Sequence, residues 1–475
     1  MDALRATASA ASSTIDLDRV VNWDVGDDIA VSATAYFTST GEDAMAEDAT
    51  EVHGIASITT ITDGAEQYSR ITTESALDYT HFCETAHGEN FCGAVGRLSS
   101  NVRFVSTDQD DPSDTSFGYG ANIHVFDIPD NSRYGFVNFA NVEFKGFGKI
   151  NSDHYAVAIK YRDQNHPASF IVNCSFNQGY NMAVRAAGSV NLTFANNVAT
   201  GNYGGGVFIE RDNALFTIAG NLIVGSYMLP SNLLSSFPYT NPIASFVIYS
   251  GDGEVYDNVA AGSQDNGFAV SASLLKVSSA LAASACSVTL ASAYSYTLAD
   301  LQAENKFRSN EAVGCRSGLM VLNLGPSESV ASDCAVVTDF MAWRSGHIGI
   351  VALDAEAGIL LANVLLAENH IGVSLDFFKD DVNVFTGIVA STIIGSLGTD
   401  LFSSCADLSD SLYTRGGQCQ AFTESDPFGT SSSCKSTVSA VYRRVGVLLP
   451  QWTNRARTCA VEGRFECQTS PAYPD

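Results

Sequence analysis

Charged residues are scarce in this sequence. Asp, Glu, Lys and Arg make up 16% of the 475 residues, against roughly 25% in an average soluble protein. Basic residues are the scarcest, with 25 against 52 acidic ones, and the formal net charge is −27. That charge repels polyanions, so nucleic acid is excluded as a partner, whereas cations, basic protein surfaces and glycans remain.

Long uninterrupted apolar runs are also missing. The most apolar stretch, GIVALDAEAGILLANVLLA, carries Asp354 and Glu356 and alternates as strands do, so no direct membrane insertion is expected. The first residues, MDALRATASAASSTIDL, lack the apolar core of a secretory signal. Because the cysteines below suggest an extracellular protein, we expect the chain to be a mature form or a fragment.

Cys-x-x-Cys pairs are absent too, which argues against a zinc site although the sequence has 11 cysteines. Cys83 and Cys92 are close enough in sequence for a local disulfide. Five more form a cysteine-rich C-terminal segment that is typical of oxidising compartments. The disulfide candidates are Cys83, Cys92, Cys405, Cys419, Cys434, Cys459 and Cys467.

Helical periodicity is lacking over most of the chain, and one short pattern takes its place. Asn or Asp, an apolar run and Gly recur as NVEFKG, NCSFNQG, NNVATG, NLIVG, NVAAG and NEAVG, followed by DFMAWRSG and NVLLAEN. Gly179, Gly201 and Gly225 are separated by 22 and 24 residues. Strand-forming runs at an irregular period of this length indicate an all-β fold, a β-solenoid of stacked coils.

The physical needs of such coils explain the pattern. Glycine supplies the positive φ of tight turns. Asparagine at one place in successive coils bonds its turn and stacks its amide on the next. The expected turn positions are Asn141, Asn173, Asn196, Asn221, Asn258, Asn310, Asn363, Gly201, Gly225, Gly262 and Gly314.

Three regions follow from the distribution of these patterns. Residues 1–120 alternate apolar and polar residues as short strands do, and we expect them to form a β-rich N-terminal cap. Residues 121–400 hold the repeats. Residues 401–475 form the cysteine-rich, disulfide-stapled tail, expected on the side or the C-terminal end of the stack.

Several segments resemble a known family in the same order along residues 15–395. VVNWDVGDDIAVSATAY, YTHF and GAVGRLSSNVRFV look like the latter part of a G8 domain. VEFKGFGKINSDHYAVAIKYRDQNHPASFIVNCSFNQGYNMAVRAAGSVNLTFANNVATGNYGGGVFIERD and VVTDFMAWRSGHIGIVALDA are similar to the parallel β-helix repeats of fibrocystin-like surface proteins and the related cell-surface hyaluronidases. The resemblance implies a secreted or membrane-tethered ectodomain with a right-handed parallel β-helix.

The family divides into adhesive or ciliary-surface proteins and enzymes that depolymerise hyaluronan, and the enzymes' histidine positions are altered here. In YAVAIK, Tyr155 is kept, but Ala158 and Lys160 occupy the histidine places. In VRAAGS, Ala187 replaces another histidine, while Glu210 survives. Because glycan cleavage needs a positioned acid and base, these replacements favour binding or assembly over catalysis.

One polar cluster still suits glycan binding or lyase-like chemistry in the groove of the stack. No catalytic residue is assigned; the alternative reading of the same residues is solvated strand-edge charges in local ion pairs. His154 is a candidate to replace a missing family histidine in space, a hypothesis that rests on its proximity in sequence to Ala158. The cluster comprises His154, Lys160, Arg162, Asp163, Arg185, Glu210, Arg211 and Asp212.

Two further kinds of site are suggested by short motifs. The loop STDQDDPSD carries Asp108, Asp110, Asp111 and Asp114, which are either weak calcium ligands or a solvated acidic loop; no other cofactor is expected. Asn191 and Asn173 begin N-glycosylation sequons, and Asn191 is the better candidate because Asn173 is expected to face inward in the turn ladder.

The sequence thus predicts an extracellular or cell-surface structural or adhesion protein that is not an enzyme. Its β-helix faces would bind other extracellular protein chains, including copies of itself in a cell-surface or flagellar filament, or glycans. The alternative is a hyaluronidase- or lyase-like enzyme that cleaves acidic polysaccharide in the groove. A calcium-dependent lectin-like module is a third, weaker interpretation.

Overall fold

The fold is seen in a computed structural model, which describes most of the chain before residue 395. The C-terminal segment 401–475, with its predicted disulfides, lies outside the described residues. The described ranges are 1–35, 49–86, 88–106, 118–127, 135–150, 152–161, 167–188, 191–210, 215–228, 243–278, 297–322, 334–352, 358–375 and 386–394.

The N-terminal residues form an antiparallel sheet, called here the N-terminal sheet. Its strand order is β1 (Asp2–Ala3), β8 (Ala94–Arg97), β3 (Asp28–Val31), β4 (Glu51–Asp63), β5 (Glu66–Thr73) and β2 (Thr14–Asp16). A hairpin of β6 (Cys83–Ala86) and β7 (Glu89–Cys92) follows, and Cys83 and Cys92 face each other across it in a disulfide.

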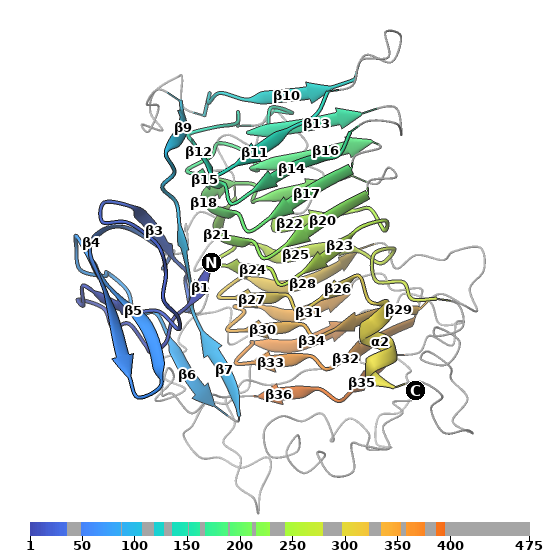
Figure 1. Cartoon of the computed structure of the whole chain (residues 1–475). Helices are drawn as coiled ribbons and strands as arrows, with labels where there is room; N and C mark the ends of the chain where they lie inside the picture. The colour runs from blue at the N-terminus through green and yellow to red at the C-terminus, as the bar shows by residue number, and fades with distance from the viewer. Residues whose placement is uncertain are drawn as a thin grey trace, which may run out of the picture.

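The rest of the described chain is a stack of coils in which every strand pairs in parallel with the strand one coil away (Figure 1). The prediction of an all-β, parallel β-helix fold is confirmed. The groove sheet consists of β10 (Ile123–Phe126), β13 (Val157–Tyr161), β16 (Val184–Gly188), β19 (Val207–Ile209), β22 (Ala244–Ile248), β25 (Asn266–Ser271), β28 (Ser317–Leu322), β31 (Ile348–Ala352) and β34 (Ile371–Leu375).

Two other faces complete each coil. The flank sheet consists of β9 (Val102–Val105), β12 (Val142–Lys145), β15 (Ser175–Asn177), β18 (Val198–Tyr203), β21 (Leu222–Tyr227), β24 (Val259–Ala261), β27 (Glu311–Val313), β30 (Met341–Trp343), β33 (Leu365–Ala367) and β36 (Thr392–Ile394). The third face has β11 (Asn138–Ala140), β14 (Ser169–Val172), β17 (Asn191–Ala195), β20 (Leu215–Ala219), β23 (Glu254–Tyr256) and β26 (Phe307–Arg308), then β29 (Cys334–Thr338), β32 (Gly358–Ala362) and β35 (Thr386–Val389). A short helix, α2 (Leu298–Glu304), begins with a capping box at Thr297.

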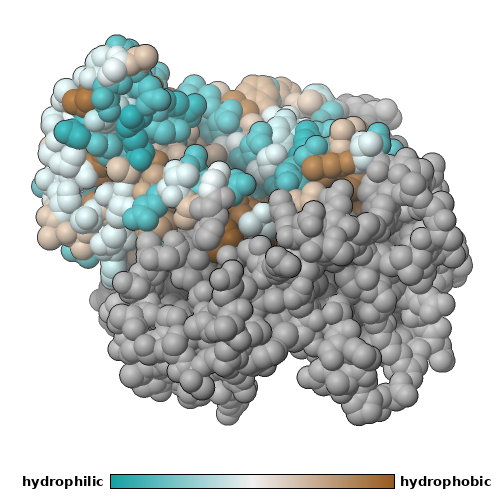
Figure 2. Space-filling view, turned by 90° about the horizontal axis from the view of Figure 1, so that it is seen from below, coloured by the Kyte–Doolittle hydropathy of each residue, from teal (hydrophilic) through white to brown (hydrophobic). Residues whose placement is uncertain are grey.

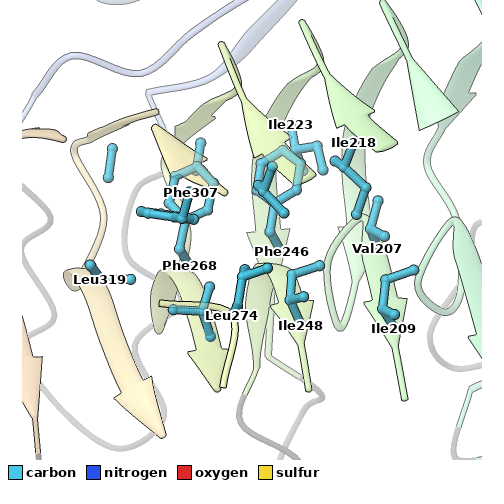
Figure 3. Close-up of a cluster of buried hydrophobic side chains, with 14 of the residues drawn as sticks. Val207, Ile209, Ile218, Ile223, Phe246, Ile248, Phe268, Leu274, Phe307 and Leu319 are labelled. Atoms are coloured by element: carbon cyan, nitrogen blue, oxygen red, sulfur yellow. The ribbon is translucent and has the colours of Figure 1, made fainter. Parts of the chain in front are cut away.

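Inward-facing apolar side chains of the three faces form one continuous core along the stack. Phenylalanines in register on neighbouring coils lie with their rings parallel, as in the pair Phe246 and Phe268, whose ring centroids are 4.7 Å apart. Figure 3 shows these rings pointing inward beside Val207, Ile209 and Ile218. Because each coil buries its apolar side chains against the next, the coils stabilise one another.

The turn asparagines fall on two adjacent positions, not on the single ladder position that the sequence predicts. Asn141, Asn173, Asn196 and Asn363 have φ of 52–56°, so they fill a left-handed turn position. The next residue faces inward, and there Asn197, Asn221, Asn258 and Asn310 form the amide ladder. The sequence alone does not distinguish the two positions, because asparagine is favourable at both of them. The second turn of the coil has positive φ of 57–65° at Gly201, Gly225, Gly262 and Gly314.

The N-terminal sheet lies against the flank sheet and does not cover the end of the stack, contrary to our expectation of a cap (Figure 1). The physical reason is that the flank sheet has an apolar outer face, which the N-terminal segment buries. A Cβ at Gly96 would lie 2.7 Å from a methyl of Val198, so glycine permits this close approach. The shared cluster comprises Ala30, Phe82, Phe91, Ala94, Leu98, Val198, Leu222, Val224, Ala261, Val313, Trp343, Ala367 and Ile394.

The first strand of the stack also lies earlier than the region boundary that the sequence suggests. β9 pairs in parallel with β12, which places residues 102–105 in the flank sheet and not in the N-terminal region. Seen from below, the described surface is mostly hydrophilic to neutral, with scattered hydrophobic patches (Figure 2). Such a surface agrees with a composition that is rich in uncharged polar residues.

Candidate functional site

A groove lies on the outer face of the groove sheet at its first three strands. Its volume is about 310 Å³. Strand register aligns His124, Ala158 and Arg185 in one outward row, and Phe126, Lys160 and Ala187 in the next. The lining residues are His124, Val125, Phe126, Asp153, Ala158, Ile159, Lys160, Arg185 and Ala187.

Arg185 is the central charged side chain of the groove, and its position is fixed from several sides. Its Nε donates to Oε1 of Glu210 at 2.6 Å, and its Nη1 lies 3.4 Å from Oδ1 of Asp153. Its guanidinium also lies over the ring of Tyr155, 5.1 Å from the centroid, and over that of Phe208, at 5.9 Å. Contacts on two edges and one face hold the guanidinium plane in a single orientation.

Two histidines stand together at the groove. The ring centroids of His124 and His154 are 5.3 Å apart, and Nδ1 of His154 lies 3.2 Å from the Ser152 hydroxyl. Burial lowers the pKa of His124, and the positive charges of His154 and Arg185 lower it further, while Asp153 opposes them. The imidazole of His124 lines the groove together with Arg185, so its protonation adds positive charge to the groove.

Tyr155 forms part of the wall beneath these groups. Its side chain is buried, and burial raises the pKa of its phenol to about 12. The phenol therefore stays neutral at physiological pH and serves as an aromatic support for Arg185.

The structure brings together His154, Lys160, Arg185 and Glu210, four residues of the predicted groove cluster. Arg162, Asp163, Arg211 and Asp212 lie outside the described residues. His124 was missed by sequence reasoning, because it precedes the first clear repeat. The alternation in IHVF, in which His124 and Phe126 face away from the core, was the available signal.

Alanines form the floor of the groove, and its described carboxylates pair with an arginine. Ala158 and Ala187 line its floor, where the resemblance implies histidines in the enzymes. Its two described carboxylates, Asp153 and Glu210, both pair with Arg185. Both carboxylates therefore help to hold the guanidinium of Arg185 in place.

The predicted metal ligands and the predicted glycosylation sites differ in how far the structure describes them. In the described ranges, no group of three or more His, Cys, Asp or Glu side chains is arranged to hold a metal ion. Asp108, Asp110, Asp111 and Asp114 lie outside those ranges. Asn191 is exposed at the start of β17, and Asn173 is also exposed because it occupies the left-handed turn position, so its amide does not face inward as we expected.

Comparison with known proteins gives relatives by sequence. No family model matches the chain. Human fibrocystin-L is 28% identical over 251 residues, which cover 49% of this chain and 6% of fibrocystin-L. Dog fibrocystin is 22% identical over 380 residues, 80% of this chain and 8% of that protein. The resemblance to fibrocystin-like proteins is confirmed at modest identity, and the chain spans less than a tenth of these relatives' length.

Solved structures with some similarity to the chain include proteins in complex with saccharides. The Gp54 tailspike of Acinetobacter baumannii bacteriophage AP22, in complex with capsular saccharide, is 11% identical with a TM-score of 0.19, covering 83% of this chain and 59% of its own. A GH87 α-1,3-glucanase catalytic domain in complex with nigerose is 10% identical with a TM-score of 0.26, covering 82% and 69%. Within the described ranges, no helix has the length and apolar character required to cross a bilayer.

Proposed function

We propose that the chain is an extracellular, non-enzymatic structural or adhesion protein whose parallel β-helix binds glycans or other protein chains. The observation that carries the proposal is the state of the groove: Arg185 is paired with Asp153 and Glu210 above a floor of Ala158 and Ala187. This arrangement keeps a recognition side chain in place and engages both described carboxylates in ion pairs with it, of which the pair to the exposed Asp153 is the weaker.

An extracellular location is supported by the Cys83–Cys92 disulfide, since disulfides persist in oxidising compartments. The similarity to fibrocystin-L and fibrocystin points the same way. The G8-like character of the N-terminal sheet, and assembly into a surface or flagellar filament, remain predictions of the sequence. Sedimentation of the purified chain over a range of concentrations, with and without calcium, tests the assembly.

The test of the non-enzymatic role is an incubation of the whole chain with acidic polysaccharides between about pH 4 and pH 8. Polymer length is followed by size-exclusion chromatography with light scattering. The proposal predicts that polymer length stays unchanged while polymer co-elutes with the protein.

Polysaccharide cleavage is the competing function, and the His124–His154 pair is the feature that favours it. Shortened polymer, with shortening lost in a His124→Gln, His154→Gln double variant, would establish the enzyme and overturn the proposal. Shortening that persists in the double variant would indicate a contaminating enzyme, which repurification of both proteins then removes.

A further inference from the structure

We propose that the groove binds a carboxylate group of an acidic saccharide, with Arg185 as the anchor and His124, which lies next to His154, as a contact that strengthens on protonation. The inference rests on the proposed function, because it takes the groove to bind a saccharide without cleaving it. It goes further by naming the chemical class of the ligand, the atoms that recognise it and the pH at which it binds.

The charges of the groove balance when the histidines are neutral. Arg185 and Lys160 are opposed by Asp153 and Glu210, whose carboxylates pair with Arg185. In a chain of net charge −27, a groove without a charge surplus has little attraction for an anion. Protonation of His124 gives the groove a positive charge and leaves its surroundings acidic.

Asp153 occupies the place that a ligand carboxylate would take. Its side chain is 84% exposed and lies 3.4 Å from Nη1 of Arg185, whereas the Glu210 side chain is 26% exposed and holds the other edge of the guanidinium. Exposed ion pairs contribute little stability, so a ligand carboxylate can displace Asp153 from Nη1. Arg185 cannot turn away, because Glu210 and the rings of Tyr155 and Phe208 fix its plane.

Apolar surface next to this anchor favours a saccharide over a simple inorganic anion. Phe126 lines the groove one strand away from Lys160 and is 60% exposed, although it is a large aromatic side chain. A pyranose ring presents a face of C–H groups that packs on an aromatic ring, while its carboxylate reaches Arg185. Inorganic sulfate or phosphate gains nothing from Phe126.

The direction of the pH dependence follows from the groups around His124. These are Lys160 on β13, Arg185 on β16, and Asp153 and His154 in the loop before β13. The positively charged neighbours disfavour the protonated imidazole of His124. The carboxylate of a bound saccharide offsets their effect. Since a sugar carboxylate remains ionised at about pH 5, its affinity rises as the pH falls and His124 takes up a proton.

The test is the binding of two acidic hexasaccharides, hexagalacturonate and an alternating glucuronate–N-acetylglucosamine hexamer, measured by calorimetry on the whole chain. Fully methyl-esterified hexagalacturonate is the matched uncharged control, and sodium sulfate is the control for a simple anion. We expect at least one acidic hexamer to bind about tenfold more tightly at about pH 5 than at about pH 7.5. The ester and sulfate should not bind detectably.

Variants locate the effect in the groove. The His124→Gln, His154→Gln double variant should lose the pH dependence, and Arg185→Gln should lose binding by at least about tenfold. His370→Gln, which changes a histidine before β34 outside the groove, should behave as the wild type. Far-ultraviolet circular dichroism of each variant separates lost binding from lost folding, and Lys160→Gln provides a second, exposed test position.

Failure of both acidic hexamers to bind at about pH 5, or a pH dependence that survives the double variant, overturns the inference. Equally tight binding of the ester and the acid also overturns the inference, because it shows that the groove does not recognise the carboxylate. The mass of each hexamer is recorded after the titration. An intact hexamer without binding contradicts only this inference, whereas a shortened hexamer contradicts the proposed function.

Discussion

Glu51 lies buried in the N-terminal sheet, where it organises a small network. Its carboxylate oxygens lie 2.7 Å from Nε2 of His53 and 2.9 Å from Nε2 of His81, and they accept the backbone N–H groups of Asp78 and Tyr79 at 2.8 Å. Burial raises the pKa of Glu51, but the hydrogen bonds from His81, the two N–H groups and His53 outweigh it and hold the pKa at about 2. The network ties the 74–81 loop to β4.

Glu51→Gln is expected to lower the free energy of unfolding by roughly 3 kcal/mol at neutral pH, because the charged acceptor is lost. The pKa of Glu51 is lowered by folding, so its stabilising effect is present above the ordinary value near 4.5 and is lost as the pH falls toward about 2. Urea unfolding at a series of pH values checks this. A variant whose stability falls as steeply as the wild type's over that window would contradict the account.

At the scale of the strands and turns, the asparagine ladder links neighbouring coils through side chains as well as backbones. Asn258 accepts the backbone N–H of Asn221 at 3.0 Å and its amide at 2.9 Å, and it donates to Ile218 O at 2.9 Å and to Oδ1 of Asn310 at 3.0 Å. All three asparagines are buried, so each amide depends on its neighbours for hydrogen bonds.

Asn258→Ala should therefore lower the unfolding free energy by about 2–4 kcal/mol, since it leaves buried groups of two other coils unbonded. Asn363→Gly is the matched control: Asn363 is exposed and sits at a left-handed turn position, with φ of 53°, which glycine adopts without strain. The unfolding free energy of this control variant should stay within about 1 kcal/mol of the wild-type value. Equal losses in the two variants would show that the two positions are equivalent, contrary to the structure.

The repeat pattern allowed the coils to be predicted, because alternation and turn chemistry are local properties of the sequence. It did not separate Asn196 from Asn197, since both residues are asparagine and only the backbone conformation directs one amide to solvent and the other into the ladder. It also did not find His124, whose partners His154 and Arg185 come from later coils. Strand register determines which residues contact each other across coils. It depends on loop lengths, which vary irregularly in this chain.

At the scale of the whole molecule, the N-terminal sheet and the coils share a buried interface. Trp343 on β30 is fully buried, with its ring centroid 6.0 Å from that of Phe82 and 5.8 Å from that of Phe91. Next to it, Arg344 donates to the backbone oxygen of Thr34 at 2.9 Å. These contacts join residues about 250 to 310 positions apart, which no local pattern in the sequence predicts.

Trp343→Ala is expected to lower the free energy of unfolding by about 3–5 kcal/mol, because it opens a cavity between the N-terminal sheet and the coils. The N-terminal sheet should then unfold in a separate, earlier thermal transition, which scanning calorimetry resolves. Trp343→Phe keeps a ring there and loses only the indole N–H that donates to Glu311 at 2.7 Å, so it should retain a single transition. Unfolding of the alanine variant in one unshifted step would show that the interface is not needed.

The central claim is that this molecule is a rigid scaffold that holds an acidic saccharide and leaves it intact. Hydrogen–deuterium exchange of the whole chain with hexagalacturonate or the glucuronate hexamer at about pH 5, followed by mass spectrometry of protein and sugar together, tests it most directly. The account predicts slower exchange in residues 123–126, 152–161 and 184–188 and an unchanged sugar mass. Protection elsewhere, or a shortened sugar, would contradict it.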